Sequence, residues 1–252
     1  MTTPIVSTSS KVDTRQGILH WAGQMIAALV IFGVLLFLTA GRLDWIQGWA
    51  YLGINALTQV LSVIVLILRH PDMLAESSQV REGNKGWDRI LAPAIVILGT
   101  FAVLVTAGLD VRFGWSGPIS GVLWWFGLVI AFASQMFVLW AMASNPYFAT
   151  TVPIQEDRGH YVISQGPYRF VRHPGYAGSM IYNLALPVML GSLWVFIPSI
   201  LTIALTFIRT GLEDRTLQTE LPGDQEYATQ THFRLIPGVW KGNTIDLAIH
   251  IP

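Results

Sequence analysis

Residues 166–176 read GPYRFVRHPGY and lie between two strongly apolar halves of the chain. Glycine and proline occur at both ends of this segment and bias Gln165 and His173 away from helical backbone. We therefore expect a shaped loop, around which the apolar segments are arranged. Its two arginines, one histidine and two tyrosines suit a polar ligand held beside a membrane. Arg169 and Arg172 are equally compatible with interfacial anchors that flank the next membrane span.

The composition predicts an integral membrane protein. Of the 252 residues, 52% are hydrophobic and 12% are charged, and the mean hydropathy is +0.51. Soluble domains carry about 25% charged residues, and apolar runs of about 20 residues, the length of a membrane span, recur in this chain. The net charge of zero gives no general attraction to nucleic acid, so we expect no nucleic-acid partner. The chain has no cysteine, which excludes disulfides, thiolate nucleophiles and cysteine-ligated zinc.

The order of apolar and polar segments predicts an all-α, polytopic helical bundle of about six spans. We expect a flexible N-terminal tail over residues 1–17, four spans over 18–144, a functional core over 145–240 and a C-terminal tail over 241–252. The last two spans are short and separated by Gly191-Ser192, so they are expected to form a closely packed hairpin. The expected spans are 18–40, 45–68, 90–109, 118–143, 176–190 and 193–208.

Polar residues after the hairpin predict short surface helices rather than a further span. A helix-compatible stretch covers 211–221 and a second piece surrounds Tyr227. We expect these pieces and the segment 234–240 to lie on the membrane surface and cover the central loop.

The basic residues predict the orientation. Thirteen of the 15 lysines and arginines fall in the N-terminal tail, the second and fourth loops and the C-terminal region, and the opposite side holds Arg42 and Arg112. Because basic residues concentrate on the cytoplasmic side, both termini and the central loop are expected in the cytoplasm.

Two polar pairs lie within the predicted helices. Arg209 and Glu213 are four residues apart and share one side of a helix, with Asp214 beside them. Burying an arginine at the edge of a bilayer costs free energy, so its presence there favours a role in function. An ordinary helix salt bridge also explains the pair. Asn55 and Gln59 have the same spacing inside the second span, where an interhelical hydrogen bond is the simpler interpretation than the lining of a lipid tunnel.

A series of motifs from about residue 145 to residue 237 resembles the membrane-embedded isoprenylcysteine carboxyl methyltransferase family, whose C-terminal core is shared with the phospholipid N-methyltransferases. The series spans the hairpin and keeps its order. Its members are Gln155, HYVI at 160–163, GPY at 166–168, RHPGY at 172–176, RTGLED at 209–214, Leu217, Tyr227 and RLIP at 234–237.

The resemblance implies an S-adenosylmethionine site formed by the loop before the hairpin and closed by the C-terminal segment. It implies catalytic roles for Arg209, which would hold a substrate carboxylate, and for Glu213. Two departures are Asp214, where the family often has a second glutamate, and Thr231, where a second tyrosine commonly follows Tyr227. The implied cofactor-binding residues are Gln155, His160, Tyr161, Val162, Ile163, Tyr168, His173, Pro174, Gly175, Tyr176 and Glu213.

The acceptor implied by the resemblance is lipophilic and enters from the bilayer, with the carboxylate of an isoprenylcysteine-like lipid preferred. Methylation of a phospholipid amine is the runner-up, and it would need a base such as Glu213, Asp214 or His173. The residues are also compatible with a sterol-reductase-like enzyme that uses NADPH, or with a non-catalytic lipid-binding protein. No metal is expected, because the spacing of the six histidines fits no metal site.

Overall fold

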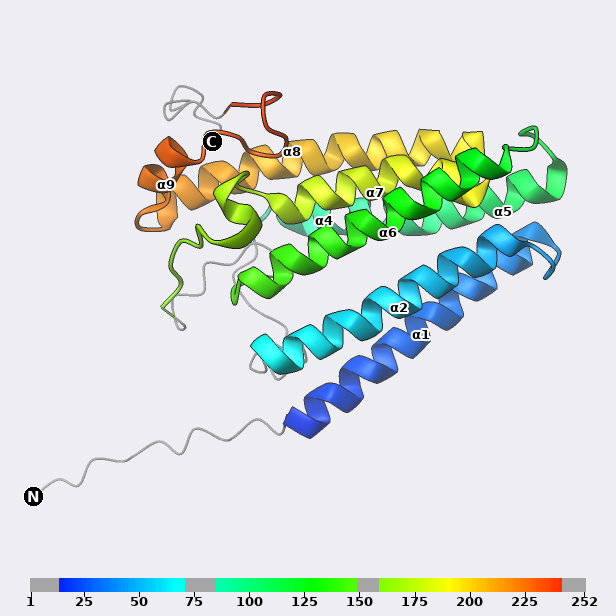
Figure 1. The fold of residues 1–252 in the computed structure, drawn as a ribbon, viewed down its shortest axis with the longest axis horizontal. Helices are drawn as coiled ribbons and strands as arrows, with labels where there is room; N and C mark the ends of the chain where they lie inside the picture. The colour runs from blue at the N-terminus through cyan, green and yellow to red at the C-terminus, as the bar shows by residue number, and fades with distance from the viewer. Residues whose placement is uncertain (1–13, 71–84, 149–158, 242–252) are drawn as a thin grey trace, which may run out of the picture.

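The computed structural model describes residues 14–70, 85–148 and 159–241, and they form an all-α bundle (Figure 1). Five segments in these ranges are long and apolar enough to cross a membrane, and a shorter helix of 17 residues lies in the C-terminal half. The prediction of an all-α polytopic membrane bundle is therefore confirmed. The helices are α1 (Thr14–Ala40), α2 (Ile46–Arg69), α4 (Asp88–Val96), α5 (Val103–Phe113), α6 (Gly121–Ser144), α7 (Pro174–Leu190), α8 (Phe196–Glu220) and α9 (Asp224–Gln230).

The expected boundaries hold for most spans, with differences at two helices. The first helix begins at Thr14, before the expected start at Ile18. The last long helix, α8, continues to Glu220, so the apolar arm expected over 193–208 and the helix-compatible stretch over 211–221 form one helix. The polar residues after 208 include Arg209, Thr210 and Asp214, which are buried against other parts of the protein. A helix can continue through polar residues when their partners are supplied by tertiary contacts.

The third span is one continuous helical segment with an irregular middle. A π-helix over Ile97–Ala102 joins α4 to α5, and Pro93 lies inside α4. A Cβ atom at Gly99 would lie 2.8 Å from the Thr202 side chain, so glycine permits this segment to pack closely on α8. The arrangement places the first turn of α4 against the later turns of α8.

Helices α6 and α7 are packed tightly through small residues. A Cβ atom at Gly178 would lie 2.6 Å from Val138 Cγ2, and one at Gly127 would lie 2.8 Å from Val188 Cγ1. Small residues allow helix backbones to approach closely in a membrane, where van der Waals contact is the main source of association. The contact fixes α7 in the bundle, and α8 returns along α7 as the second arm of the predicted hairpin.

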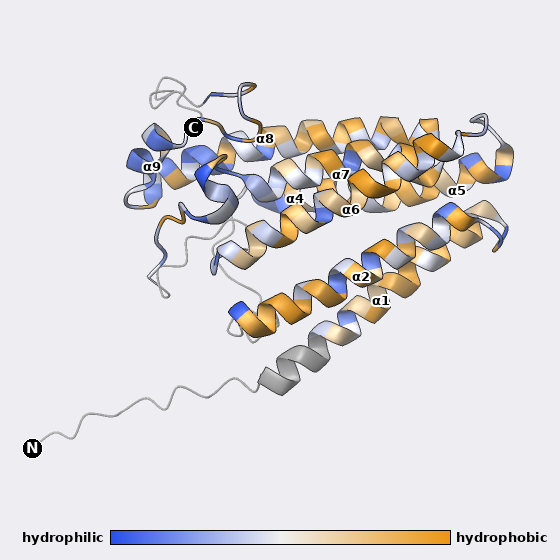
Figure 2. Ribbon diagram, viewed as in Figure 1, coloured by the Kyte–Doolittle hydropathy of each residue, from blue (hydrophilic) through white to orange (hydrophobic). Residues whose placement is uncertain are grey.

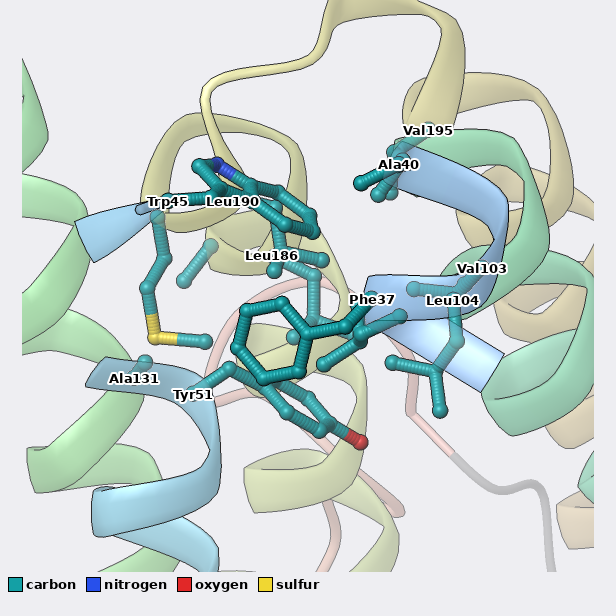
Figure 3. Packing of buried hydrophobic residues seen from close by; sticks show 14 residues of the cluster. Phe37, Ala40, Trp45, Tyr51, Val103, Leu104, Ala131, Leu186, Leu190 and Val195 are labelled. Carbon is teal, nitrogen blue, oxygen red and sulfur yellow. The ribbon is translucent and has the colours of Figure 1, made fainter. Parts of the chain in front are cut away.

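An apolar core joins α1, α2, α5 and α7 near the short turns of the bundle. Figure 3 shows Phe37, Trp45 and Tyr51 among the buried side chains, together with Leu186 and Leu190. The same end contains the turn after α5, where Asp110 accepts hydrogen bonds from the Ser116 backbone (2.7 Å) and hydroxyl (2.6 Å). In the second span, Asn55 Nδ2 donates to the Tyr182 hydroxyl at 3.1 Å, which confirms the interhelical hydrogen bond.

Hydrophilic residues gather at the opposite end of the bundle. Figure 2 shows apolar residues along the long helices and polar residues around α9 and the loop before α7. Large apolar side chains such as Leu68 and Val122 face outward, with exposed fractions of 74% and 83%. Outward apolar side chains fit a lipid environment, and the polar end is where a water-soluble ligand would approach.

Candidate active site

The loop before α7 has the shaped backbone that its sequence predicts. Gly166 has φ +60°, and a Cβ atom there would lie 2.4 Å from Ser144 Oγ, so only glycine fits. A 3₁₀ turn follows over Gly166–Arg169, and Asn145 Nδ2 donates to the Tyr168 hydroxyl at 3.1 Å. Pro174 then begins α7, at a position where its missing N–H costs nothing.

The C-terminal segment covers this loop through backbone hydrogen bonds, as expected. The Arg172 and His173 N–H groups donate to the carbonyls of Phe233 and Arg234, each at 2.9 Å. The Trp240 ring stacks on Phe207 of α8 with ring centroids 3.9 Å apart. These contacts close the polar end of the bundle with residues far from the loop in sequence.

Asp214 is the buried centre of this polar end. Its side chain is 1% exposed and accepts from Arg234 Nε at 2.7 Å, Arg172 Nη2 at 3.1 Å and Gln218 Nε2 at 2.8 Å. Its other oxygen lies 3.1 Å from His173 Nε2. One carboxylate thus joins the loop, α8 and the C-terminal segment.

Arg209 is paired with an acid that the sequence patterns did not single out. Its Nε and Nη2 donate to the two oxygens of Asp88 at 2.8 and 3.2 Å, and both side chains are buried. The guanidinium also lies over the Tyr176 ring, 5.4 Å from its centroid. Asp88 is the first residue of α4, so the contact spans 121 positions in the sequence.

Glu213 lies beside two of the four predicted cofactor-binding residues around the start of α7, Tyr176 and His173. The Tyr176 hydroxyl donates a short hydrogen bond to Glu213 Oε2. His173 Nδ1 lies 4.0 Å from Glu213 Oε1, while the other ring nitrogen contacts Asp214. The two neighbouring acids therefore have different surroundings, because Glu213 lines the cavity described below and Asp214 does not.

A cavity of about 700 Å³ brings the predicted residues together, a volume suited to a cofactor-sized ligand. Gln155 lies outside the described residues, and every other predicted site residue lines this cavity. They are His160, Tyr161, Val162, Ile163, Tyr168, His173, Pro174, Gly175, Tyr176, Arg209 and Glu213.

Further polar residues line the cavity beside the predicted site residues. Asn145, Tyr147, Arg172, Asp224 and Tyr227 line its polar end. The Tyr147 and His160 rings are 4.2 Å apart, and the Arg172 Nε atom is buried without a hydrogen-bond partner. Arg172 and Tyr227 belong to the motif series, whereas no motif marks Asn145, Tyr147 and Asp224, which come from the end of α6, the turn after it and the start of α9.

The charges at the polar end are perturbed by burial. Burial raises the pKa of Asp224 from 3.8 to about 6, with the nearby Asp214 charge adding to the rise. Burial also lowers the pKa of the Arg172 guanidinium, although the negative charge of Asp214 acts in the opposite direction. Ionisable groups with perturbed pKa values that face a cavity are typical of binding sites.

The other end of the cavity has an apolar wall supplied by α4. Pro93, Ile95, Val96 and Ile97 line it, and Val96 and Ile97 are 52% and 57% exposed. Since these exposed side chains belong to a helix that can cross a membrane, the wall continues onto the lipid-facing surface. The cavity thus joins a polar end to an apolar one.

Comparison with known proteins finds a relative and a family model that are similar to parts of the chain. A stretch of 98 residues is 29% identical to the uncharacterized protein YpbQ of Bacillus subtilis (strain 168), covering 38% of this chain and 57% of the relative. Residues 125–219, which contain most of α6, the loop, α7 and nearly all of α8, match the sequence model of a family. That family is the isoprenylcysteine carboxyl methyltransferase family, so the helices and loop that build most of the cavity resemble those of membrane methyltransferases.

Proposed function

We propose that this protein is an S-adenosylmethionine-dependent methyltransferase that modifies a lipophilic acceptor reaching it from the bilayer. The observation that carries the proposal is the cavity at the polar end. Eleven residues predicted from the sequence for cofactor or substrate contact line it, and all of them lie in or next to the stretch that resembles membrane methyltransferases.

The residues of the cavity fit the chemical groups of this cofactor. Its adenine ring needs an aromatic surface, which Tyr147 and His160 offer. Its hydroxyl and ammonium donors need acceptors, and Asp224 lines the cavity with a buried carboxylate. Its carboxylate needs donors, and the unpartnered Arg172 Nε is available. The donor and acceptor types in the cavity therefore match the ligand.

When bound, the cofactor would supply a methyl group attached to a positively charged sulfur. On transfer, the rest of the cofactor would leave as a neutral thioether that keeps the electrons of the broken carbon–sulfur bond. In this proposal Glu213 provides a negative charge near that group and Tyr176 fixes the carboxylate by its hydrogen bond. Because charged side chains of the site such as Arg172 and Arg209 are buried, fixed charges act there with less screening than in water. Positioning of the two reactants supplies the remaining effect.

The apolar wall of α4 supports a lipophilic acceptor. Pro93, Val96 and Ile97 would contact its hydrocarbon part, while the reactive end lies toward Arg209 and Glu213. The resemblance implies that the acceptor is the carboxylate of an isoprenylcysteine-like lipid, and this stays a prediction. The contact between Arg209 and Asp88 affects it, because Arg209 is the residue expected to hold that carboxylate. Both termini and the cavity are proposed to face the cytoplasm, where the cofactor is dissolved.

The proposal is tested by methyl transfer in membranes. Vesicles that contain the protein are incubated with cofactor labelled in its methyl group, and label is counted in the lipid extract. We expect wild-type protein to label the extract and Glu213→Gln to reduce the rate by about tenfold or more, because a charge near the sulfonium is lost.

Glu226→Gln is the matched control, since Glu226 is exposed on α9 and does not line the large cavity. This variant should retain the wild-type rate. Unlabelled extracts with folded wild-type protein, or equal rates for Glu213→Gln and wild type, would refute the proposal.

A further inference from the structure

The contact between Asp88 and Arg209 lies where the proposed acceptor would be held. Both residues line the cavity beside the apolar wall of α4. Their side chains are 1% and 8% exposed, and the paired bonds of 2.8 and 3.2 Å join both oxygens of the acid to one edge of the guanidinium. Paired bonds of this kind are the means by which arginine binds a carboxylate. The protein itself thus supplies a carboxylate to Arg209.

The charges near the pair also disfavour an anionic acceptor. Asp88, Arg209 and Glu213 line the cavity and together carry one net negative charge when all are ionised, while the other lining arginines are Arg89, which is exposed to solvent, and Arg172, which is paired with Asp214. A carboxylate acceptor would add a second negative charge to a buried site with limited solvent screening. An acceptor without that charge avoids both this repulsion and competition with Asp88 for the guanidinium.

We infer that the acceptor presents a nucleophile that still carries a proton, a lipid hydroxyl or amine, and that Asp88 sets this specificity by occupying Arg209. The inference rests on the proposed methyltransferase function and names its acceptor class. Asp88 lies outside residues 125–219, so similarity to a family over that stretch does not carry information about it.

Such an acceptor must lose its proton as the new bond forms. The nucleophilic oxygen or nitrogen gains the methyl carbon, the carbon–sulfur bond breaks toward sulfur, and the proton passes to a carboxylate of the protein. Glu213 suits this step because it lines the cavity, whereas Asp214 is already held by two arginines, a histidine and a glutamine. The protonated Glu213 can then release the proton to water.

The test compares three probes that share a ring and a dodecyl tail and differ in their reactive group: para-dodecylphenol, para-dodecylaniline and para-dodecylbenzoate. Retention of each labelled probe is measured on protein in lipid nanodiscs saturated with S-adenosylhomocysteine, with empty nanodiscs as the blank. We expect the wild type to bind the phenol or the aniline at least about tenfold more tightly than the benzoate. The first two probes distinguish a hydroxyl acceptor from an amine.

Asp88→Asn tests the role of Asp88 itself. Removing its charge takes the competing carboxylate away from Arg209, so binding of the benzoate should strengthen by about tenfold, and the benzoate should raise the thermal stability of this variant. Asp110→Asn is the matched control, because Asp110 is an equally buried acid at the opposite end of the bundle. It should keep the wild-type order of the three probes.

Preference of the wild type for the benzoate overturns the inference, as does an unchanged order of probes in Asp88→Asn or the absence of specific retention of any probe. The wild-type comparison decides the acceptor class even if Asp88→Asn does not fold. Loss of S-adenosylhomocysteine binding by the wild type is a separate result, which refutes the methyltransferase proposal instead.

Discussion

Replacing Asp214 with asparagine should loosen the whole polar end of the bundle. The substitution keeps the size of the side chain but removes the charge that Arg172 and Arg234 share. The new amide can also direct N–H donors at the guanidinium groups. Both arginines have buried side chains, 3% and 8% exposed, so water cannot replace the lost partner without local opening.

The expected cost follows from this burial. Removing one partner of a buried ion pair typically costs about 3–5 kcal/mol, because the remaining charge is left uncompensated. Each 1.4 kcal/mol changes an equilibrium constant about tenfold, so local opening should become more frequent by about a hundredfold or more. The effect should be largest where the loop and the C-terminal segment are joined by backbone bonds.

Hydrogen exchange measures this opening directly. The Arg172 and His173 amides, which donate to the carbonyls of Phe233 and Arg234, should exchange at least about a hundredfold faster in Asp214→Asn. Asp44→Asn is the control, because Asp44 forms an exposed pair with Arg42 and should leave exchange unchanged. Equal exchange of these amides in Asp214→Asn and wild type would show that the carboxylate does not hold the segments together.

Three further substitutions test other parts of the account. Gly178→Ala should destabilise the protein by about 1–3 kcal/mol in thermal unfolding, because the new Cβ atom would lie 2.6 Å from the Val138 side chain. Gly53→Ala is the control and should keep the wild-type stability, because the space around Gly53 is open. Equal stability of the two variants would contradict the close α6–α7 contact. The Asp224 carboxyl has a pKa of about 6 in the folded protein and an ordinary value of 3.8, so the folded state binds the extra proton and loses stability as pH rises from about 4 to 6. Asp224→Asn should therefore be more stable than wild type at pH 7 by up to about 3 kcal/mol and lack this pH dependence, and parallel pH profiles would refute the assignment. Asn55→Ala should lower stability by about 1 kcal/mol and leave S-adenosylhomocysteine affinity unchanged, and a loss of affinity would place Asn55 in ligand binding.

The sequence predicted the membrane bundle and most of the residues around the cavity because both leave local signals. Apolar runs of span length predict helices, and glycine and proline around residues 166–176 predict the loop. The motifs from 160 to 176 and at 209–213 can be recognised in the sequence because each is a short run of neighbouring residues. Their side chains meet because the hairpin brings α8 back beside the start of α7.

The partners of the charged residues could not be predicted in the same way. Asp88 was one of several charges in a polar segment, and nothing local indicates that it meets Arg209 across 121 positions. Asp214 and Glu213 are neighbouring acids that differ by one methylene group, yet Asp214 is enclosed by arginines and Glu213 lines the cavity. The apolar run ends near 208 while α8 continues to Glu220, since polarity along a chain does not show which polar groups are buried with partners.

Calorimetric titration of the detergent-purified wild-type protein with S-adenosylhomocysteine, and in parallel with NADPH, is the decisive test of the proposed cofactor site. We expect saturable binding of S-adenosylhomocysteine and no binding of NADPH. Binding of NADPH alone would indicate a reductase, and binding of neither ligand by folded protein would indicate a lipid-binding protein without this chemistry. Either result would contradict a methyltransferase site in the cavity.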